Sequence, residues 1–302
     1  MSKNIQILTR LAFVFVIIIL GNYVIVAQTV LSGDWKAEAR SEKNPDKIHL
    51  SFERRSEKGG RNQHGSSFNY ADLQGLSREQ VLTGGAVKFS LAREAGSIEC
   101  EGSFSGGKGA GTFRFTANPK FVAAMKTRGF DFEADSSRGK NQDLEERLFA
   151  ATTLNVTTAL ADDLLSANFG KLEVDDLFKA AIFKVDSQFM REMKASGFPN
   201  LGMEDLVKAR IFKIDADFVR QVVAMGFDKE PFESLVKMRI FKVTPEFIAE
   251  ARSEGLTNLD VEDLVKMRIF KIDSGFIRQA KADGVPLEVE KLVQKRIGVW
   301  SK

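Results

Sequence analysis

The residue types that most often carry catalysis or bind metals are scarce in this chain, which has two histidines, His49 and His64, and one cysteine, Cys100. The histidines lack the HExxH spacing of a zinc site, and a single cysteine excludes an intrachain disulfide and a multi-cysteine metal site. The stretch HGSSF (64–68) places a serine near a histidine, but GxSxG is absent and local adjacency does not make a triad. We therefore expect no catalytic or metal-binding residue, two polar histidines in a β region, and a cysteine that packs as a small core residue.

The glycine-rich stretch GSFSGGKGAG (102–111) is a second candidate, because Gly102, Gly107 and Lys108 stand at the spacing of a phosphate-binding loop. Such a loop needs Ser or Thr after the lysine, to bind Mg²⁺, and a helix that starts there. Here Gly109 follows the lysine, and the next residues, GTFRF, predict a strand. We therefore expect a hairpin turn at this stretch and no bound cofactor.

Acidic pairs recur through the second half of the chain, as Asp175-Asp176, Glu204-Asp205 and Glu262-Asp263. Paired carboxylates can act as a general acid and a general base. Each of these pairs, however, stands at the start of a predicted helix, where negative charge is favoured by the positive end of the helix dipole. We interpret the pairs as helix-stabilising residues.

Arginines recur near the end of each repeat of the sequence, at Arg210, Arg239, Arg268 and Arg296. Each stands seven residues after an apolar residue of a predicted helix stripe, so it points roughly toward the packed face. An arginine in that position buries its stem and reaches carboxylates or helix-end carbonyls in the adjacent unit. We predict a structural role, as struts between units, for Arg210, Arg239 and Arg268.

Two rows of lysines remain as candidates for binding. One row, Lys208, Lys237 and Lys266, points away from the apolar stripe, and the other, Lys213, Lys242 and Lys271, recurs at a turn. Such rows could contact an anionic polymer or an acidic partner, although a solvated face is the commoner outcome. We take these six lysines as the candidate partner surface.

The candidate residues lie in two regions whose apolar residues follow different patterns. The first region extends from Gly33 to Thr116. Its apolar residues alternate with polar ones, and glycine-rich stretches such as EKGGRNQHG (57–65) separate the alternating segments. The alternating segments are KIHLSFERR (47–55), AVKFSLARE (86–94), SIECEGSF (97–104) and GTFRFTA (111–117). This pattern predicts hairpins of an antiparallel sheet, with one apolar face that must pack on a second layer or on the helices that follow.

In the second region the period is helical and the sequence repeats every 29 residues, as marked by Phe183, Phe212, Phe241 and Phe270. Three positions later stands a residue whose side chain can accept hydrogen bonds from the amides of a helix start. These predicted N-caps are Asp186, Asp215, Thr244 and Asp273. Eleven positions after each cap stands a glycine, where a short helix would end in a left-handed turn. These glycines are Gly197, Gly226, Gly255 and Gly284.

The same register extends backward to Leu154 and to Phe115, which makes six units that begin at residues 115, 154, 183, 212, 241 and 270. Each unit continues into a second amphipathic helix, such as DVEDLVKMRI (260–269). Two short helices cannot bury their apolar faces alone, so neighbouring units must stack. We predict an α+β protein, with an N-terminal antiparallel β domain over 33–116 and a solenoid-like α-helical array of six two-helix repeats over 115–297.

The N-terminus places Lys3 and Arg10 before an apolar run over 11–20, and the residues IVA that end at position 27 suit a cleavage site. This is the layout of a secretory signal peptide over 1–27. The alternative is an uncleaved membrane anchor formed by residues 11–27, although a spanning helix needs about 20 apolar residues. Both interpretations place the rest of the chain outside the cytoplasm, periplasmic or secreted.

The formal net charge is only +3, which argues against a dedicated nucleic-acid-binding protein with a dominant basic field. The hydrophobic content of 43% is sufficient for a sizeable core. We expect a protein partner in the cell envelope, no nucleic acid, and membrane contact only through an uncleaved N-terminal segment. The sequence assigns no oligomeric state.

Units such as FKVTPEFIAEARSEGLTNLDVEDLVKMRI (241–269) resemble helical repeats of the type GVTPEFI…GL…DDLVALRI. Those repeats occur in bacterial exported tails, including tails attached to membrane metallopeptidases of the antibiotic-sensor type. The segments DLQGL, VKFSLAREAGSIECEGSF and GKGAGTFRF resemble the β region that often precedes such repeats, so the resemblance covers about 33–297. It implies an extracytoplasmic sensing or interaction role. The peptidase part is missing, since HExxH and a multi-span membrane region are absent, so the resemblance implies no protease activity.

We therefore expect an exported, non-enzymatic interaction or scaffold protein that takes part in envelope sensing or signalling. The alternative is a protein that binds an anionic envelope polymer, either a glycan or lipid headgroups, through its rows of lysine. Salt would weaken such binding steeply and would affect an apolar protein interface little. A third hypothesis, an enzyme with an unrecognised site, requires a deep pocket that gathers His49 or His64 with carboxylates.

Overall fold

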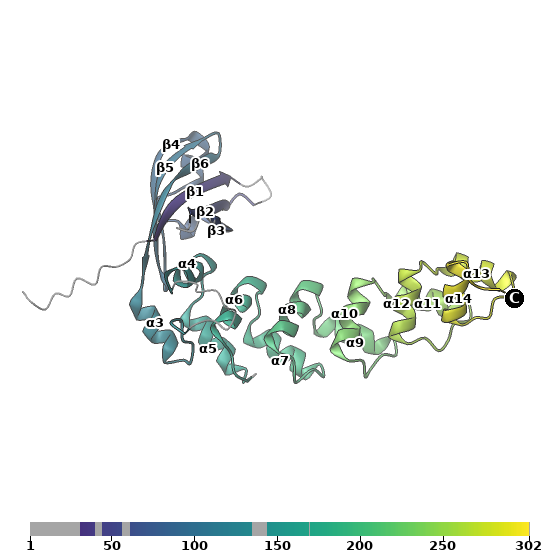
Figure 1. Ribbon diagram of the computed structural model, residues 1–302. Helices are drawn as coiled ribbons and strands as arrows, with labels where there is room; N and C mark the ends of the chain where they lie inside the picture. Colours follow the sequence, from purple (N-terminus) through teal and green to yellow (C-terminus); the bar gives the residue numbers. More distant parts are fainter. Residues whose placement is uncertain (1–30, 40–43, 56–60, 135–143, 169, 302) are drawn as a thin grey trace, which may run out of the picture. The chain divides into compact units, whose positions relative to one another are not determined.

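A computed structural model of the chain describes residues 31–39, 44–55, 61–134, 144–168 and 170–301. The described residues form two compact units, which are considered separately (Figure 1). The β unit contains residues up to Asn118 together with Asp143–Ala150, and the helical array contains the remainder. The fold is α+β, with an antiparallel sheet followed by a run of helices, as the sequence predicts. The segment predicted as a signal peptide or anchor, 1–27, lies outside the described residues.

The β unit is built on one antiparallel sheet, which has six strands within the described ranges. They are β1 (Leu31–Ala39), β2 (Lys47–Arg55), β3 (Arg61–Asn69), β4 (Gly85–Arg93), β5 (Gly96–Ser105) and β6 (Lys108–Ala117). The order across the sheet is β3-β2-β1-β6-β5-β4, so two three-stranded meanders are joined by the pairing of β1 with β6. The observed sheet therefore extends slightly beyond the predicted 33–116.

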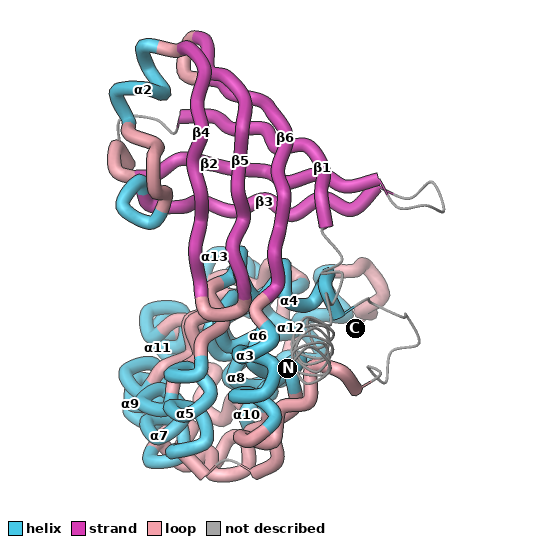
Figure 2. The backbone as a smooth tube through the Cα atoms, turned by 90° about the vertical axis from the view of Figure 1, so that its left-hand side faces the viewer, coloured by secondary structure: helices cyan, strands magenta, loops and turns pink. Residues whose placement is uncertain are grey.

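The sheet is curled, and the strands of its two meanders cross at a steep angle in Figure 2. This curl lets the alternating apolar residues of the concave face pack on one another, as illustrated by Ile48, Leu50 and Phe52 of β2, which are at most 2% exposed. Trp35 of β1 is fully buried at the centre of the curl, with its ring edge-on to Phe89 at 5.3 Å between centroids. Its Nε1 donates a hydrogen bond to the Glu101 carbonyl at 3.2 Å.

A pair of facing glycines permits the close approach of Trp35 to β5. Gly102 of β5 pairs with Gly111 of β6. A Cβ atom on Gly102 would lie 2.2 Å from the Ala110 carbonyl oxygen and 2.6 Å from the Trp35 ring. A side chain at this position is therefore sterically excluded, which explains why glycine stands here within a strand.

Several elements of the β unit, including β1, are absent from the segments that the sequence predicts. The stretch EKGGRNQHG is predicted as a turn, but Arg61–Asn69 forms β3 at the edge of the sheet. An edge strand can be mostly polar, and of its described side chains only Phe68 is buried, so β3 lacks the alternation that marks a strand. The short helix α2 (Arg78–Thr83) was also missed, although Ser77 and Gln80 form a capping box at its start.

The helical array and the adjoining residues of the β unit contain twelve helices in the described part of the chain, arranged as six consecutive pairs (Figure 1). The first helices of the pairs are α3 (Pro119–Lys126), α5 (Thr158–Ser166), α7 (Ser187–Ala195), α9 (Ala216–Ala224), α11 (Pro245–Ser253) and α13 (Ser274–Ala282). The second helices are α4 (Leu144–Leu154), α6 (Val174–Phe183), α8 (Met203–Phe212), α10 (Phe232–Ile240), α12 (Val261–Ile269) and α14 (Val289–Arg296). The boundary between the two units falls within α4, after Ala150.

The array is held together mainly by its second helices, because α6, α8, α10, α12 and α14 each contact the next in turn. Equivalent leucines Leu206, Leu235 and Leu264 are at most 1% exposed between them. Each pair of helices buries its apolar stripe within the pair and against the neighbouring pairs, as in other repeat proteins.

Single residues at fixed positions start and end the first helices. Asp186, Asp215, Thr244 and Asp273 are the N-caps of α7, α9, α11 and α13, and each side chain accepts a hydrogen bond from the backbone N–H of the phenylalanine three residues later. Gly197, Gly226, Gly255 and Gly284 follow these helices with φ between 80° and 106°. Asn168 takes the same role in the preceding unit with φ 51°.

We predict that Gly255→Val lowers the stability of the array. At φ 106° a β-branched side chain is strained, and its Cβ would lie 3.1 Å from Cδ1 of Leu287. A loss of about 1–3 kcal/mol in the free energy of unfolding is expected, measured by urea denaturation. Gly275→Ala in α13 is the control, since alanine favours a helix and should leave stability equal or higher. Equal stability of Gly255→Val and the wild type would contradict the assignment of this turn.

Candidate functional site

The two histidines of the β unit lie on opposite faces of the sheet and cannot form one site. His64 of β3 is paired with Phe52 of β2, so it shares the apolar face, whereas His49 stands between the buried Ile48 and Leu50 and faces the other way. Nδ1 of His49 is buried and makes no hydrogen bond among the described residues. Each histidine must therefore be judged by its own surroundings.

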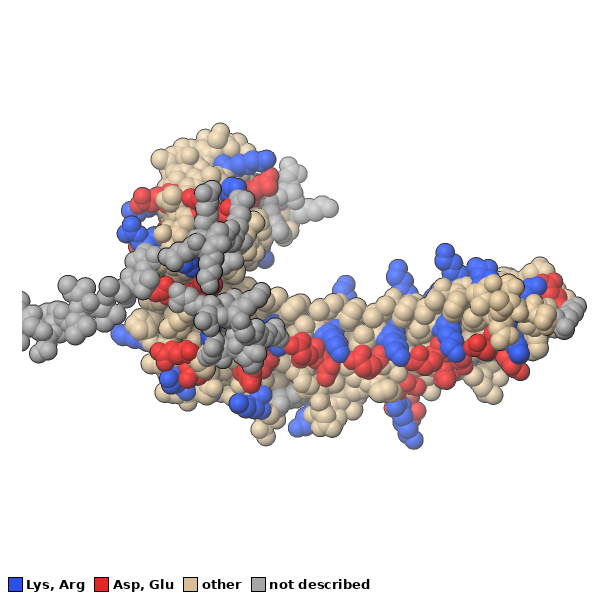
Figure 3. All heavy atoms as spheres, viewed as in Figure 1, with Lys and Arg blue, Asp and Glu red and all other residues tan. Residues whose placement is uncertain are grey.

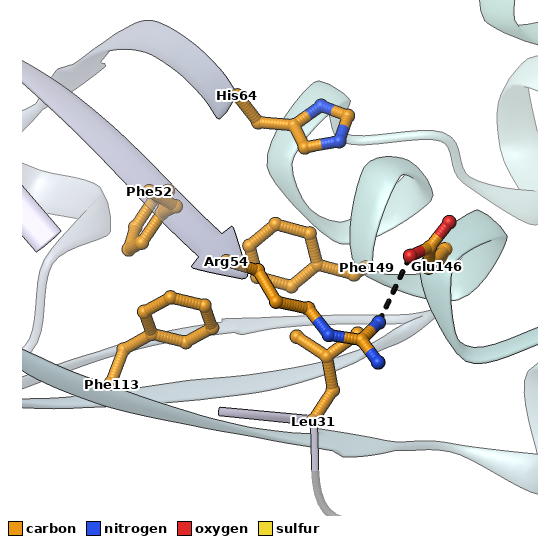
Figure 4. A pocket seen from close by; sticks show the side chains of 7 residues that line it. All are labelled: Leu31, Phe52, Arg54, His64, Phe113, Glu146 and Phe149. Carbon is orange, nitrogen blue, oxygen red and sulfur yellow. Dashed lines mark hydrogen bonds and ion pairs between the residues drawn. The ribbon is translucent and has the colours of Figure 1, made fainter. Parts of the chain in front are cut away.

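His64 does stand beside a carboxylate, around a small cavity within the β unit. Figure 4 shows His64 and Arg54 from neighbouring strands, together with Glu146 and Phe149 from the first turns of α4. Nη1 of Arg54 donates to Oε1 of Glu146 at 2.9 Å. The cavity volume is about 20 Å³, room for about one water molecule and far below the several hundred Å³ of a substrate pocket.

The walls of this cavity are aromatic. Phe149 of α4 stacks on Phe113 at 5.3 Å between ring centroids and meets Phe52 edge-on at 5.6 Å. His64 also meets Phe149 edge-on, at 5.8 Å. His64 is exposed as a residue, but partial burial lowers its pKa, and the charge of Glu146 opposes that shift. The cluster closes the open end of the sheet and is best explained as packing.

The other sequence candidates for chemistry have structural positions. Cys100 on β5 is 1% exposed, and burial raises the pKa of its thiol to about 12, so it is not a reactive thiolate at neutral pH. The phosphate-loop-like stretch is the hairpin between β5 and β6, where Gly106 and Gly107 have φ 54° and 77°. No helix starts at Lys108, which pairs with Glu38 instead.

The acidic pairs stand in the first turns of α6, α8 and α12, as expected for residues that stabilise helix starts. Within the described ranges, no group of three or more His, Cys, Asp or Glu side chains is arranged to hold a metal ion.

The arginines of the second helices act as struts, a term used below for Arg210, Arg239 and Arg268. The guanidinium carbon of Arg239 lies 3.7 Å from the centroid of the Phe218 ring, on the first helix of the same pair. Its Nη2 donates at 2.7 Å to the carbonyl of Lys213, which ends the preceding second helix, and Arg268 bonds the Lys242 carbonyl in the same way. Arg239 and Arg268 therefore each join three helices, whereas Arg210 lies over the Phe189 ring and pairs with Asp186 at 3.8 Å.

The lysines that the sequence places on an outward row, Lys208, Lys237 and Lys266, are not free. Each pairs with a glutamate in the first turn of the next second helix: Glu233, Glu262 and Glu290 respectively. Lys179 and Glu204 continue the series at 2.7 Å. The hydrogen bond from Lys208 to Glu233 raises the pKa of Lys208. We call these four pairs the Lys–Glu ladder, and basic and acidic side chains alternate along the array in Figure 3.

The second predicted row, Lys213, Lys242 and Lys271, has a backbone role that the sequence prediction missed. These residues and Lys184, defined together as the turn lysines, have φ between 51° and 58° and lie at or directly after the C-cap of a second helix. A left-handed backbone costs a residue with a Cβ atom roughly 1–2 kcal/mol. Their side chains are exposed and form no ion pair within the part of the chain that the structure describes.

Next to each turn lysine stands an exposed isoleucine, two residues earlier. This Ile row consists of Ile182, Ile211, Ile240, Ile269 and Ile297, whose exposed fractions are 48–54%. The members follow one another at intervals of 29, 29, 29 and 28 residues, so one lies at the end of each of five stacked second helices. The sequence contains the signal, since isoleucine recurs directly before the repeated Phe-Lys, but its exposure becomes visible only in the structure.

The helical array contains a much larger hollow than the small cavity of the β unit described above. A groove of about 650 Å³ lies between α7 and α9, lined mainly by small and apolar side chains such as Ala195, Val219 and Val223, with Glu192 and Arg220 as charged members. It lacks the converging polar groups of an active site. The repeated surface formed by the Ile row and the turn lysines is the candidate functional site.

Comparisons with protein-family models, with curated proteins and with solved structures find no match to this chain. None of the helices in the described ranges is both long and apolar enough to cross a membrane.

We predict that Arg239→Lys destabilises the array by about 1–2 kcal/mol, measured by urea denaturation. Lysine cannot stack a planar group on Phe218 while it reaches the Lys213 carbonyl. Arg220→Lys is the matched control, because Arg220 is exposed and pairs only with Asp217 of its own helix among the described residues. Equal losses in the two variants would show that the strut contributes nothing specific.

A second prediction concerns the pH dependence of the β unit. Because the folded-state pKa of His64 is lowered, the unfolded chain binds more protons as pH falls below about 6.5, and stability falls with it. Urea denaturation at pH 7.5 and 5.5 should therefore show a larger loss in the wild type than in His64→Gln. An equal loss in both proteins would contradict a desolvated imidazole.

Proposed function

We propose that this protein is an exported, non-enzymatic interaction protein whose helical array binds a protein partner in the bacterial cell envelope. The β unit precedes the array in the chain, and sensing or signalling is the role that such a complex would serve. Export rests on the predicted signal peptide or anchor at 1–27.

One observation carries the proposal: an exposed isoleucine recurs at the ends of five successive second helices. A single exposed isoleucine needs no explanation, whereas five at equivalent positions form a regular row of apolar side chains along a stacked scaffold. Repeat arrays use such extended surfaces to bind other macromolecules.

An anionic envelope polymer is the second candidate partner, and the turn lysines favour it. They provide four exposed positive charges in a row, without ion-pair partners among the described residues. The Lys–Glu ladder weakens this candidate, because it neutralises the other predicted lysine row. Binding to a polymer through lysines alone should weaken steeply as salt rises.

Site-specific photo-crosslinking in the native cells tests the proposal. A photoreactive amino acid at Ile211, Ile240 or Ile269 should give the same crosslinked protein from all three positions. The same group at the exposed Gln188 and Gln221, on first helices, should give none. Cell fractionation should place the crosslinked complex in the envelope or periplasm.

Crosslinks of equal yield from the isoleucine and glutamine positions, or from neither, would overturn the proposal. A cytoplasmic location would overturn the exported part of it.

A further inference from the structure

The turn lysines occupy positions where their side chains are unfavourable for the backbone. The left-handed turn itself is required, because the carbonyls of Lys213 and Lys242 must point toward the strut arginines. That requirement concerns the backbone and would be met better by glycine or asparagine.

The ends of the series use those better residues. The left-handed residue after α4 is Asn155, with φ 57°. The left-handed residue after α14 is Gly298, with φ 79°, and α14 ends one residue earlier in its repeat than the other second helices do. The four positions between them are all lysine. The interior units thus accept an unfavourable conformation to keep a positive charge at this turn, which indicates a role for the charge itself.

An apolar side chain accompanies every one of these charges. Ile182, Ile211, Ile240 and Ile269 stand two residues before Lys184, Lys213, Lys242 and Lys271 and are about half exposed. A partner that neutralised only the lysines would leave the isoleucines in water. The surface therefore suits a partner that carries both negative charge and apolar groups.

The carboxylates near this surface are already engaged. Glu233, Glu262 and Glu290 pair with the ladder lysines, and Asp215 and Asp273 are N-caps that accept backbone N–H groups. The turn lysines are thus the positive charges left for a partner among the described residues of this surface.

The spacing of the repeat selects an extended chain. Packed helices lie about 8–10 Å apart, so successive isoleucines on the stacked second helices are separated by roughly that distance. An extended polypeptide advances about 3.1–3.4 Å per residue, so about three of its residues span one unit. A one-residue-wide row matches a linear chain better than a planar membrane surface.

We infer that the Ile row and the turn lysines together bind an extended acidic segment of a protein, with an apolar residue at about every third position. The isoleucines contact its apolar side chains and the lysines pair with its carboxylates. This inference rests on the proposed function and specifies the chemistry of the partner.

Fluorescence anisotropy with a labelled peptide of five Leu-Pro-Glu repeats tests the inference on the full chain, because proline favours an extended backbone. The wild type should bind this peptide, and five repeats of Ser-Pro-Glu or of Leu-Pro-Lys should bind at least roughly tenfold more weakly. Replacing Lys184, Lys213, Lys242 and Lys271 with Asn should weaken binding roughly tenfold or more while thermal stability stays equal or rises.

A matched variant controls for net charge. Replacing Lys171, Lys194, Lys229 and Lys281 with Asn removes the same number of positive charges from other exposed positions of the array. It should bind the Leu-Pro-Glu peptide as the wild type does. Changing Ile211, Ile240 and Ile269 to Ser should weaken binding without loss of folding.

The remaining outcomes overturn the inference. Equal weakening in the two lysine variants would show a general charge effect. Binding of dextran sulfate or of phosphatidylglycerol vesicles as tight as that of the Leu-Pro-Glu peptide would assign the surface to an anionic polymer or a membrane. Equally tight binding of the Ser-Pro-Glu peptide would show that the surface does not recognise apolar side chains. If crosslinks form in cells at the isoleucines but none of these probes binds, the proposed function stands and the acidic-segment inference fails.

Discussion

The packed second helices of the array are linked by one recurring polar contact, between a strut arginine and the carbonyl that ends the preceding second helix. The guanidinium is held flat on a phenylalanine of the first helix while it donates to that carbonyl. Because helix C-termini leave carbonyls without intrahelical donors, Arg239 and Arg268 each satisfy a group that would otherwise need water. The left-handed turn residue and the phenylalanine both take part in this contact, and both recur with the repeat.

The β unit depends on a different constraint: a single sheet must curl so that the apolar side chains of one face are buried against one another. Trp35 occupies the centre of that closure, and two facing glycines give it room. The first turns of α4 then supply Phe149 to the open end, so a helix completes the aromatic core. His64 and Glu146 line the small cavity beside this aromatic core, and their proximity alone does not create a site for chemistry.

Residues with strong local preferences made much of the fold predictable from sequence. Asp186 and Gly197 mark a helix start and end because capping depends on a single side chain or a single φ angle. β3 escaped prediction because an edge strand needs no apolar alternation. Lys213 was recognised as a turn residue, but its conformation was hidden because lysine rarely adopts it. The pairing of Lys208 with Glu233 depends on how helices stack, which the pattern within one helix does not reveal.

The Lys–Glu ladder also has a direction. Each interior second helix contributes a cation to the next helix along the chain. At the two ends the equivalent position is held by Ala150 in α4 and by Gln294 in α14, neither of which carries a charge. The ladder is therefore confined to the second helices from α6 to α14, and at each end of this series the position of the ladder lysine is held by an uncharged side chain.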